Sequence, residues 1–120
     1  MENSHIHIGG RMHVSPDKIK LLEADINYTT VFFLDGTKAV VSTTMGTIES
    51  RLPKKDFVRI NRSTVVNRSA VSHYFIRPDF DEVKLQDASF VKVSRRRRME
   101  MRSLLVSQNE TLKQILYENL

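Results

Sequence analysis

Hydrophobic and polar residues alternate along four stretches of the chain, and this period of two is typical of β-strands with one buried face. The stretches read HIHI at 5–8, NYTTVFFLDGTKAVVST at 27–43, DFVRINRSTVV at 56–66 and EVKLQDASFVKVS at 82–94. Residues that favour strands predominate in them, chiefly valine, threonine, phenylalanine and isoleucine. The pattern predicts a mainly β fold of antiparallel strands.

Two of these stretches contain a turn signal. Asp35-Gly36 lies between two apolar runs and predicts a β-hairpin with a type I′ turn, in which both central residues have positive φ. The residues QDAS at 86–89 separate VKL from FVKV and predict a second hairpin with a less favourable turn.

The segment 43–53, TTMGTIESRLP, predicts a short helix between strands. Met45, Ile48 and Leu52 are spaced to share one helical face, which can cover a sheet. Thr43 and Thr44 are the candidate N-caps, and the proline at position 53 ends the helix.

The last fourteen residues, SQNETLKQILYENL, predict a C-terminal amphipathic helix. Ser107 and Glu110 have the spacing of a capping box, and the leucines and isoleucine that follow form one stripe. The stripe must be buried, either against the sheet or against a second copy of the chain, because so short a helix is marginal alone. The sequence leaves these two alternatives open.

The length of 120 residues and the 40% hydrophobic content fit one globular domain. Residues 1–14 are an N-terminal segment and a candidate for an added strand, residues 15–105 are a continuous β-rich domain, and residues 106–120 hold the C-terminal helix. The chain lacks cysteine, a secretory signal pattern and an apolar run of the ~18 residues needed to span a membrane. The expected location is therefore the cytoplasm.

The net charge of +5 is unevenly distributed. Residues 1–50 hold four Lys/Arg and six Asp/Glu, whereas the remaining seventy hold fifteen and eight, so the basic character belongs to the second half. Clustered positive charge of this kind favours a polyanionic partner, with nucleic acid ahead of an acidic membrane surface.

No motif indicates an enzyme or a cofactor. The sequence contains no GxSxG, GxxxxGK[ST] or GxGxxG pattern, and it has only four glycines. His5, His7 and His13 lack a further ligand at a useful spacing, so exposed positions on the first strand explain them better than a metal site does. The sequence predicts neither catalysis, cofactor nor metal.

Two basic segments remain as candidates for binding. In FVRINRSTVVNRSAV, residues 57–71, arginines and asparagines interrupt an apolar strand, and their side chains match guanine and adenine edges. Ion-paired arginines on a solvated strand face are the competing explanation. The second segment is Arg95–Arg98, which follows a strand at the expected start of a helix and suits phosphates or base edges.

The order of these elements resembles that of a LytTR DNA-binding domain. The matching stretches are IKLLEADINYTTVFFLDG, TTMGTIESRL, DFVRINRSTVVNRSAV and VKLQDASFVKVSRRRR, within residues 18–102. The resemblance implies a bacterial transcriptional regulator, similar to response-regulator output domains, that is an elongated antiparallel β arrangement. It also implies double-stranded DNA as partner, direct repeats with two copies or a homodimer per site, and loops that read successive major grooves.

The resemblance further implies which residues contact DNA. They are Asn27, Tyr28 and Thr29 in the turn after the first core strand, Arg62 before the serine of the RS pair, and Arg95 and Arg96 after the last strand. Arg59 and Asn67 also match the motif, with a role in the fold as the competing interpretation. Phosphate contacts are expected from Arg97, Arg98, Arg102, Lys54 and Lys55.

The sequence departs from the family pattern in three respects. Asn61 stands where many relatives have histidine, and Ala88 stands where the last hairpin turn often has glycine. Only about 17 residues precede the domain, so a signal is expected to arrive without a receiver domain.

Two other functions stay open. One is an RNA-binding β module with Phe32, Phe33, Tyr28 and Tyr74 as stacking residues, and the other is a protein-interaction module that uses the C-terminal helix.

Overall fold

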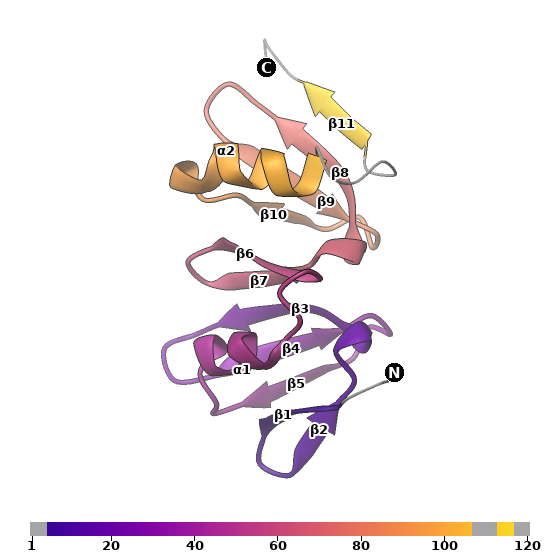
Figure 1. The fold of residues 1–120 in the computed structure, drawn as a ribbon, viewed down its shortest axis with the longest axis vertical. Coiled ribbons are helices and arrows are strands. Elements are labelled where there is room, and N and C mark those ends of the chain that lie inside the picture. The colour runs from indigo at the N-terminus through magenta and orange to yellow at the C-terminus, as the bar shows by residue number, and fades with distance from the viewer. Residues whose placement is uncertain (1–4, 107–112, 117–120) are drawn as a thin grey trace. The chain divides into compact units, whose positions relative to one another are not determined.

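The computed structural model describes residues 5–106 and 113–116 and shows a mainly β fold (Figure 1). The strands are β1 (Ile6–Gly9), β2 (Met12–Val14), β3 (Ile19–Ala24), β4 (Thr29–Phe33), β5 (Lys38–Val41), β6 (Phe57–Asn61), β7 (Thr64–Asn67), β8 (Val71–Ile76), β9 (Asp81–Leu85), β10 (Phe90–Lys92) and β11 (Lys113–Leu116). The helices are α1 (Met45–Arg51) and α2 (Arg98–Met101), which a π-helical turn (Arg102–Val106) continues, with short 3-10 turns at Pro16–Lys18, Arg68–Ala70 and Arg95–Arg97. The predicted fold class is confirmed.

The chain divides into two compact units. The N-terminal unit comprises residues 1–59 and 63–67, and the C-terminal unit comprises residues 60–62 and 68–120. One sheet has the strand order β5-β4-β3-β7-β6, the second has the order β10-β9-β8-β11, and β1 and β2 form a two-stranded sheet of their own. Residues 6–14 of the N-terminal segment therefore form a hairpin of their own.

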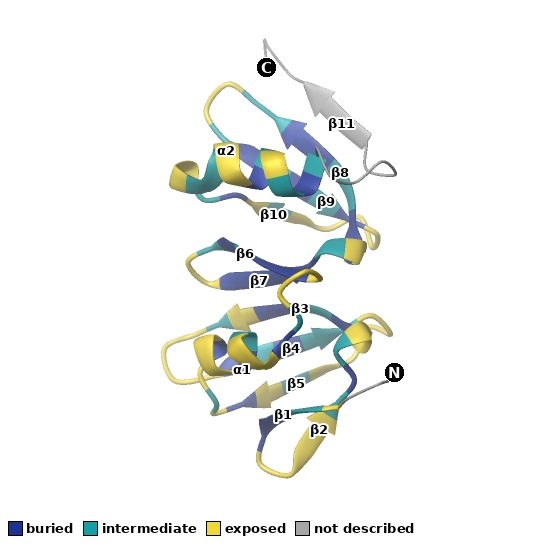
Figure 2. Ribbon diagram, viewed as in Figure 1, coloured by how far each residue is buried: buried dark blue, intermediate teal, exposed yellow. Residues whose placement is uncertain are grey.

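The core of the N-terminal unit lies between α1 and one face of its sheet. Met45, Ile48 and Leu52 are buried there together with strand residues such as Leu22 and Val31. The Thr44 hydroxyl caps α1 by accepting a hydrogen bond from the Thr47 amide at 3.3 Å. The predicted helix and its cap are confirmed, and burial is concentrated in the strands while most connecting turns are exposed (Figure 2).

Both predicted hairpins form, but the turn type expected at Asp35-Gly36 is wrong. Gly36 has a φ of 92° and Ala88 has a φ of 72°, while Asp35 is not among the residues with positive φ. In each hairpin a three-residue loop places its third residue in the left-handed region, because the first two residues form an ordinary turn. The aspartate carboxylate then accepts the amide two residues later, from Thr37 at 2.9 Å in the first hairpin and from Ser89 at 3.0 Å in the second.

Ala88→Gly is expected to raise the free energy of unfolding by about 0.5–1 kcal/mol. Left-handed backbone costs a residue with a Cβ about 1–2 kcal/mol, and the greater freedom of glycine in the unfolded chain offsets part of this gain. Gly36→Ala is the reciprocal control and should destabilise, although a Cβ there meets nothing within 4 Å. Urea denaturation measures the free energy of unfolding of both variants. A lower value for Ala88→Gly than for the wild-type protein would show that the backbone at Ala88 is not strained.

The C-terminal helix predicted from the sequence is wrong for residues 113–116. They form β11, which runs parallel to β8 and pairs Lys113 with His73 and Leu116 with Ile76. A strand here satisfies backbone groups along an otherwise open edge of β8, and four residues are too few for apolar periodicity to distinguish the two structures. The rest of the predicted helix, residues 107–112 and 117–120, lies outside the described residues. The last described helix is instead α2 with its π-helical turn.

Candidate nucleic-acid interface

Asp81 at the start of β9 organises the end of the arginine run. Its carboxylate is fully buried and accepts hydrogen bonds from the Tyr74 hydroxyl at 2.8 Å and the Arg102 Nε at 2.7 Å. Arg98 pairs with the other carboxylate oxygen at 2.9 Å and also donates to the Arg77 carbonyl at 2.8 Å. These bonds attach α2 to the sheet of the C-terminal unit.

The environment of Asp81 determines its ionisation. Burial alone would raise its pKa, but hydrogen bonds from Arg102, Tyr74 and Arg98 outweigh that effect and lower the pKa below its ordinary value. Burial and the hydrogen bond to Asp81 raise the pKa of Tyr74, so the tyrosine stays protonated and donates. The cluster is therefore a buried carboxylate with two cations and one neutral donor.

The free energy of unfolding is expected to fall as the pH drops below about 4, the usual pKa of an unfolded aspartate. A carboxylate whose pKa is lowered in the folded state stabilises the fold above the unfolded pKa, and this contribution is lost as the pH falls toward the folded pKa. Urea denaturation of the protein and of Asp81→Asn between pH 7 and pH 3 measures the effect. An equally steep acid dependence in the variant would show that other carboxylates cause it.

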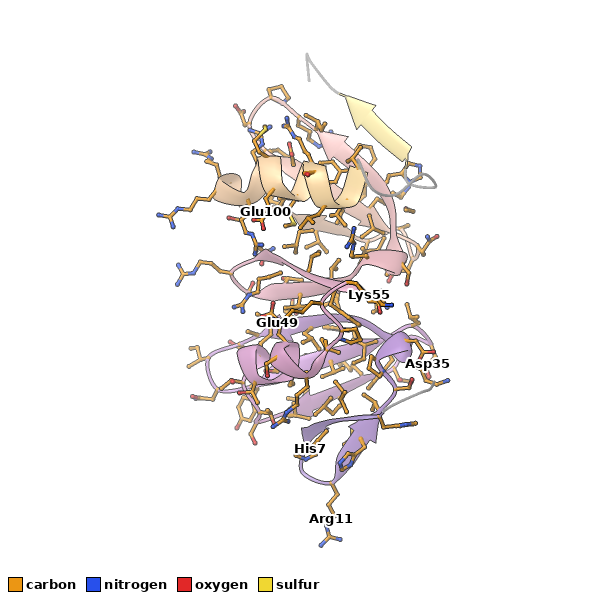
Figure 3. The ribbon with its side chains drawn as sticks, in the orientation of Figure 1. His7, Arg11, Asp35, Glu49, Lys55 and Glu100 are labelled. Atoms are coloured by element: carbon orange, nitrogen blue, oxygen red, sulfur yellow. The ribbon has the colours of Figure 1, made fainter. Side chains whose placement is uncertain are left out.

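The first residues of the arginine run have a different environment. Arg97 forms an ion pair with Glu100 of α2 at 3.1 Å, and both side chains lie at the surface (Figure 3 labels Glu100). Arg95 and Arg96 are exposed, and neither guanidinium forms an ion pair within residues 5–106 or 113–116. Only the beginning of the run is thus presented to solvent without an acidic partner.

Arg62 belongs to the same part of the C-terminal unit as Arg95 and Arg96. It is exposed in the turn between β6 and β7. The Ser94 amide donates to the Ile60 carbonyl at 2.9 Å, and the Asn61 side-chain amide donates to the Lys92 carbonyl at 2.8 Å. These two bonds join the residues directly before Arg62 to those directly before Arg95, so the segments that carry the three exposed arginines are neighbours.

In the N-terminal unit, the turn between β3 and β4 carries the other predicted contact residues. Asn27 and Tyr28 are exposed, Tyr28 to 55%. Thr29 is buried, with 1% exposure, and its hydroxyl donates to the Thr43 carbonyl at 2.7 Å. The Thr29 side chain is therefore part of the fold and is not available at the surface.

Arg59 and Asn67 serve the fold of the N-terminal unit. Arg59 forms an ion pair with Glu49 of α1 at 2.9 Å, and Asn67 is buried and donates to the Ile19 carbonyl at 2.8 Å (Figure 3 labels Glu49). These contacts agree with the competing interpretation from the sequence, in which Arg59 and Asn67 have a role in the fold.

Arg98 and Arg102, which were predicted to contact phosphates, both pair with Asp81, and a phosphate contact from either one stays a prediction. Both guanidinium groups are engaged with a buried carboxylate, so they hold α2 in place. Lys54 and Lys55 are exposed in the segment that follows α1, where a phosphate contact stays a prediction.

Sequence reasoning missed one residue that arranges this surface and gave another a different role. Asp81 is the first of three buried alternate positions in β9, with Val83 and Leu85, and an acid on that apolar face was a signal that it has a cationic partner. Asn61 looked like a base-reading residue, but its amide is used to join β6 to the end of β10.

The histidines of the first hairpin have local partners. The His7 ring lies 5.0 Å from that of His13, and its Nε2 lies 2.7 Å from the Gly10 carbonyl oxygen. Among the described residues, no three metal-ligating side chains are grouped to hold a metal ion.

A mainly antiparallel β chain with exposed arginines gathered at strand ends has the features of a DNA-binding domain. A family model described as the LytTr DNA-binding domain matches residues 9–106, and the chain belongs to this family. It is therefore a DNA-binding domain of a family that is not defined by an enzymatic activity.

Among solved structures, the chain is similar to the LytTr DNA-binding domain of a protein described as a methyl-accepting/DNA response regulator from Bacillus cereus. The TM-score is 0.73 at 22% identity, and the alignment covers 88% of this chain and 99% of the other. This likeness confirms the fold that the sequence resemblance implied. The comparison with curated proteins found no match. Within the described residues, no helix is long and apolar enough to cross a membrane.

Proposed function

We propose that this chain is a bacterial transcriptional regulator that binds specific double-stranded DNA sequences without a recognition helix. Arg62, Arg95 and Arg96 read base edges in a major groove, and Asn27 and Tyr28 of the N-terminal unit read a second groove. Arg97 contributes to phosphate binding. Direct repeats, each bound by one copy, are the expected sites.

The observation that carries this proposal is how the arginines of the C-terminal unit differ in their environments. Arg98 and Arg102 pair with the buried Asp81, whereas Arg62, Arg95 and Arg96 are exposed on two segments that the hydrogen bonds of Ser94 and Asn61 join. Exposed arginine presents the rigid fork that matches the O6 and N7 acceptors of guanine. Such a cluster supports base recognition better than a diffuse basic face does.

Selection from a pool of random double-stranded DNA, carried out at two salt concentrations, tests the proposal. A repeated motif that survives the higher salt is expected, because base contacts persist when phosphate contacts are screened. Binding that ignores sequence and disappears at higher salt would contradict it and leave an electrostatic patch.

A second candidate function is binding of single-stranded RNA on the face of β8, β9 and β10 that lies away from α2. Registered rows place His73, Lys84 and Phe90 side by side, and Phe90 is 50% exposed with the Lys84 ammonium 5.9 Å from its ring centroid. Aromatic rings beside cations can stack unpaired bases. Tyr74, predicted for stacking, is fully buried and cannot serve. Competition by single-stranded RNA against the selected duplex separates the two functions.

A further inference from the structure

Ile26 is an aliphatic side chain with almost no contact to the rest of the fold. It is 92% exposed, a larger fraction than that of any other exposed large hydrophobic residue described in the structure, the next being Met99 at 66%. It lies in the turn that joins β3 to β4, directly before Asn27 and Tyr28.

Hydrogen bonds fix the backbone of this turn. The Asp25 amide donates to the Tyr28 carbonyl at 2.8 Å, and the Ile26 amide donates to the Asp25 carboxylate at 2.8 Å. The first bond closes the turn at its base, the second is local to Asp25 and Ile26, and Ile26, Asn27 and Tyr28 are exposed in the turn. Isolated exposed aliphatic residues are common on proteins. Ile26 differs in being held at the tip of a closed turn beside two polar side chains that are also exposed.

The charge of the turn decides what it can bind on DNA. No lysine or arginine occurs between Lys20 and Lys38, and Glu23 and Asp25 are exposed. The turn therefore offers no cationic side chain to a phosphate, and a base edge is the part of DNA that its exposed isoleucine suits. In the major groove the apolar feature of a base edge is the 5-methyl group of thymine, and the asparagine amide matches adenine.

We infer that Ile26 is a specificity-determining residue that packs on the 5-methyl group of a thymine, next to the adenine that Asn27 contacts. This inference rests on the proposed function and extends it by naming the bases that one turn contacts. The turn selects an adenine and a thymine through shape and hydrogen bonds, while the arginines of the other unit supply the charge-dependent contacts.

Uracil substitution tests the inference on the duplex obtained by selection. Each thymine is replaced singly by deoxyuridine, which removes one methyl group and leaves the base pair intact. At one position the wild-type protein should bind about fourfold more weakly, the expected effect of losing one buried methyl group. Ile26→Ala should bind the thymine duplex about fourfold more weakly than wild type and should lose nothing further on uracil at that position.

Leu34→Ala is the matched control, because Leu34 is also an exposed aliphatic residue, at 50%, and lies in a turn at the other end of β4. It should keep the uracil penalty of the wild type. The salt dependence of binding should be the same for Ile26→Ala and wild type, since no phosphate contact is removed.

The outcomes separate this inference from the proposed function. Equal uracil penalties in wild type and Ile26→Ala at every position, on a duplex that is bound specifically, would overturn the role of Ile26 alone. Failure of the selection to return any motif would overturn both.

Discussion

Asp81→Ala is expected to lower the free energy of unfolding by about 3–5 kcal/mol, because it removes one partner of a buried ionic cluster. Arg98 and Arg102 would keep their charges next to β9 with no carboxylate, and the Tyr74 hydroxyl would lose its acceptor. Urea denaturation followed by circular dichroism measures the loss.

Glu100→Gln is the matched control for this experiment. Glu100 is the partner of Arg97 in an exposed ion pair, and removing its charge should change stability by about 0.5 kcal/mol or less. If Asp81→Ala lowered the free energy of unfolding as little as Glu100→Gln does, Asp81 would not be the anchor of α2. If both substitutions lowered it by several kcal/mol, the exposed ion pair would contribute as much to stability as the buried cluster.

Arg62→Ala is expected to weaken binding to the selected duplex by about 1–3 kcal/mol, the usual cost of losing a bidentate base contact. The loss on random duplex should be much smaller, because base readout contributes little there. Fluorescence anisotropy measures the affinities for both duplexes. The salt concentration must be held constant, because phosphate contacts make each dissociation constant depend on salt.

Arg11→Ala provides the matched loss of charge. Arg11 is exposed in the turn between β1 and β2 and points away from that hairpin (Figure 3). Its removal lowers the net charge by the same amount without touching the exposed arginines of the C-terminal unit. Equal effects of the two substitutions on both duplexes would mean that Arg62 acts only through its charge.

The strands, both hairpins and α1 were predictable because each is specified by residues close together in sequence. Alternation identified β4, β5 and β9, and the spacing of Met45, Ile48 and Leu52 identified α1 with its Thr44 cap. The turn type at Asp35-Gly36 was not predictable, because Asp-Gly occurs in more than one type of hairpin loop. These loop types differ in which residue takes a positive φ. The last segment failed for a different reason, since β11 depends on the open edge of β8.

The candidate site was predictable in location but not in the roles of its members. The run of four arginines was visible in the sequence, and Arg95 and Arg96 are exposed as expected. Which arginines of the run are exposed and which are paired depends on Asp81. This residue precedes Arg98 by seventeen residues and becomes its partner only when β9 and α2 pack together. Thr29 and Asn67 were misleading for a similar reason, because their partners Thr43 and Ile19 lie far from them in the sequence.

The most direct test of the central claim is a binding selection repeated with Arg62→Ala and Arg11→Ala beside the wild-type protein. The claim is that Arg62, Arg95 and Arg96 read bases while Arg98 and Arg102 hold the fold through Asp81. It predicts that the wild-type protein selects a guanine at one position of the motif. Arg62→Ala should lose the preference at that position and keep the rest of the motif. Arg11→Ala should return the wild-type motif unchanged. A full wild-type motif from Arg62→Ala, with affinity lowered equally on all sequences, would contradict the claim.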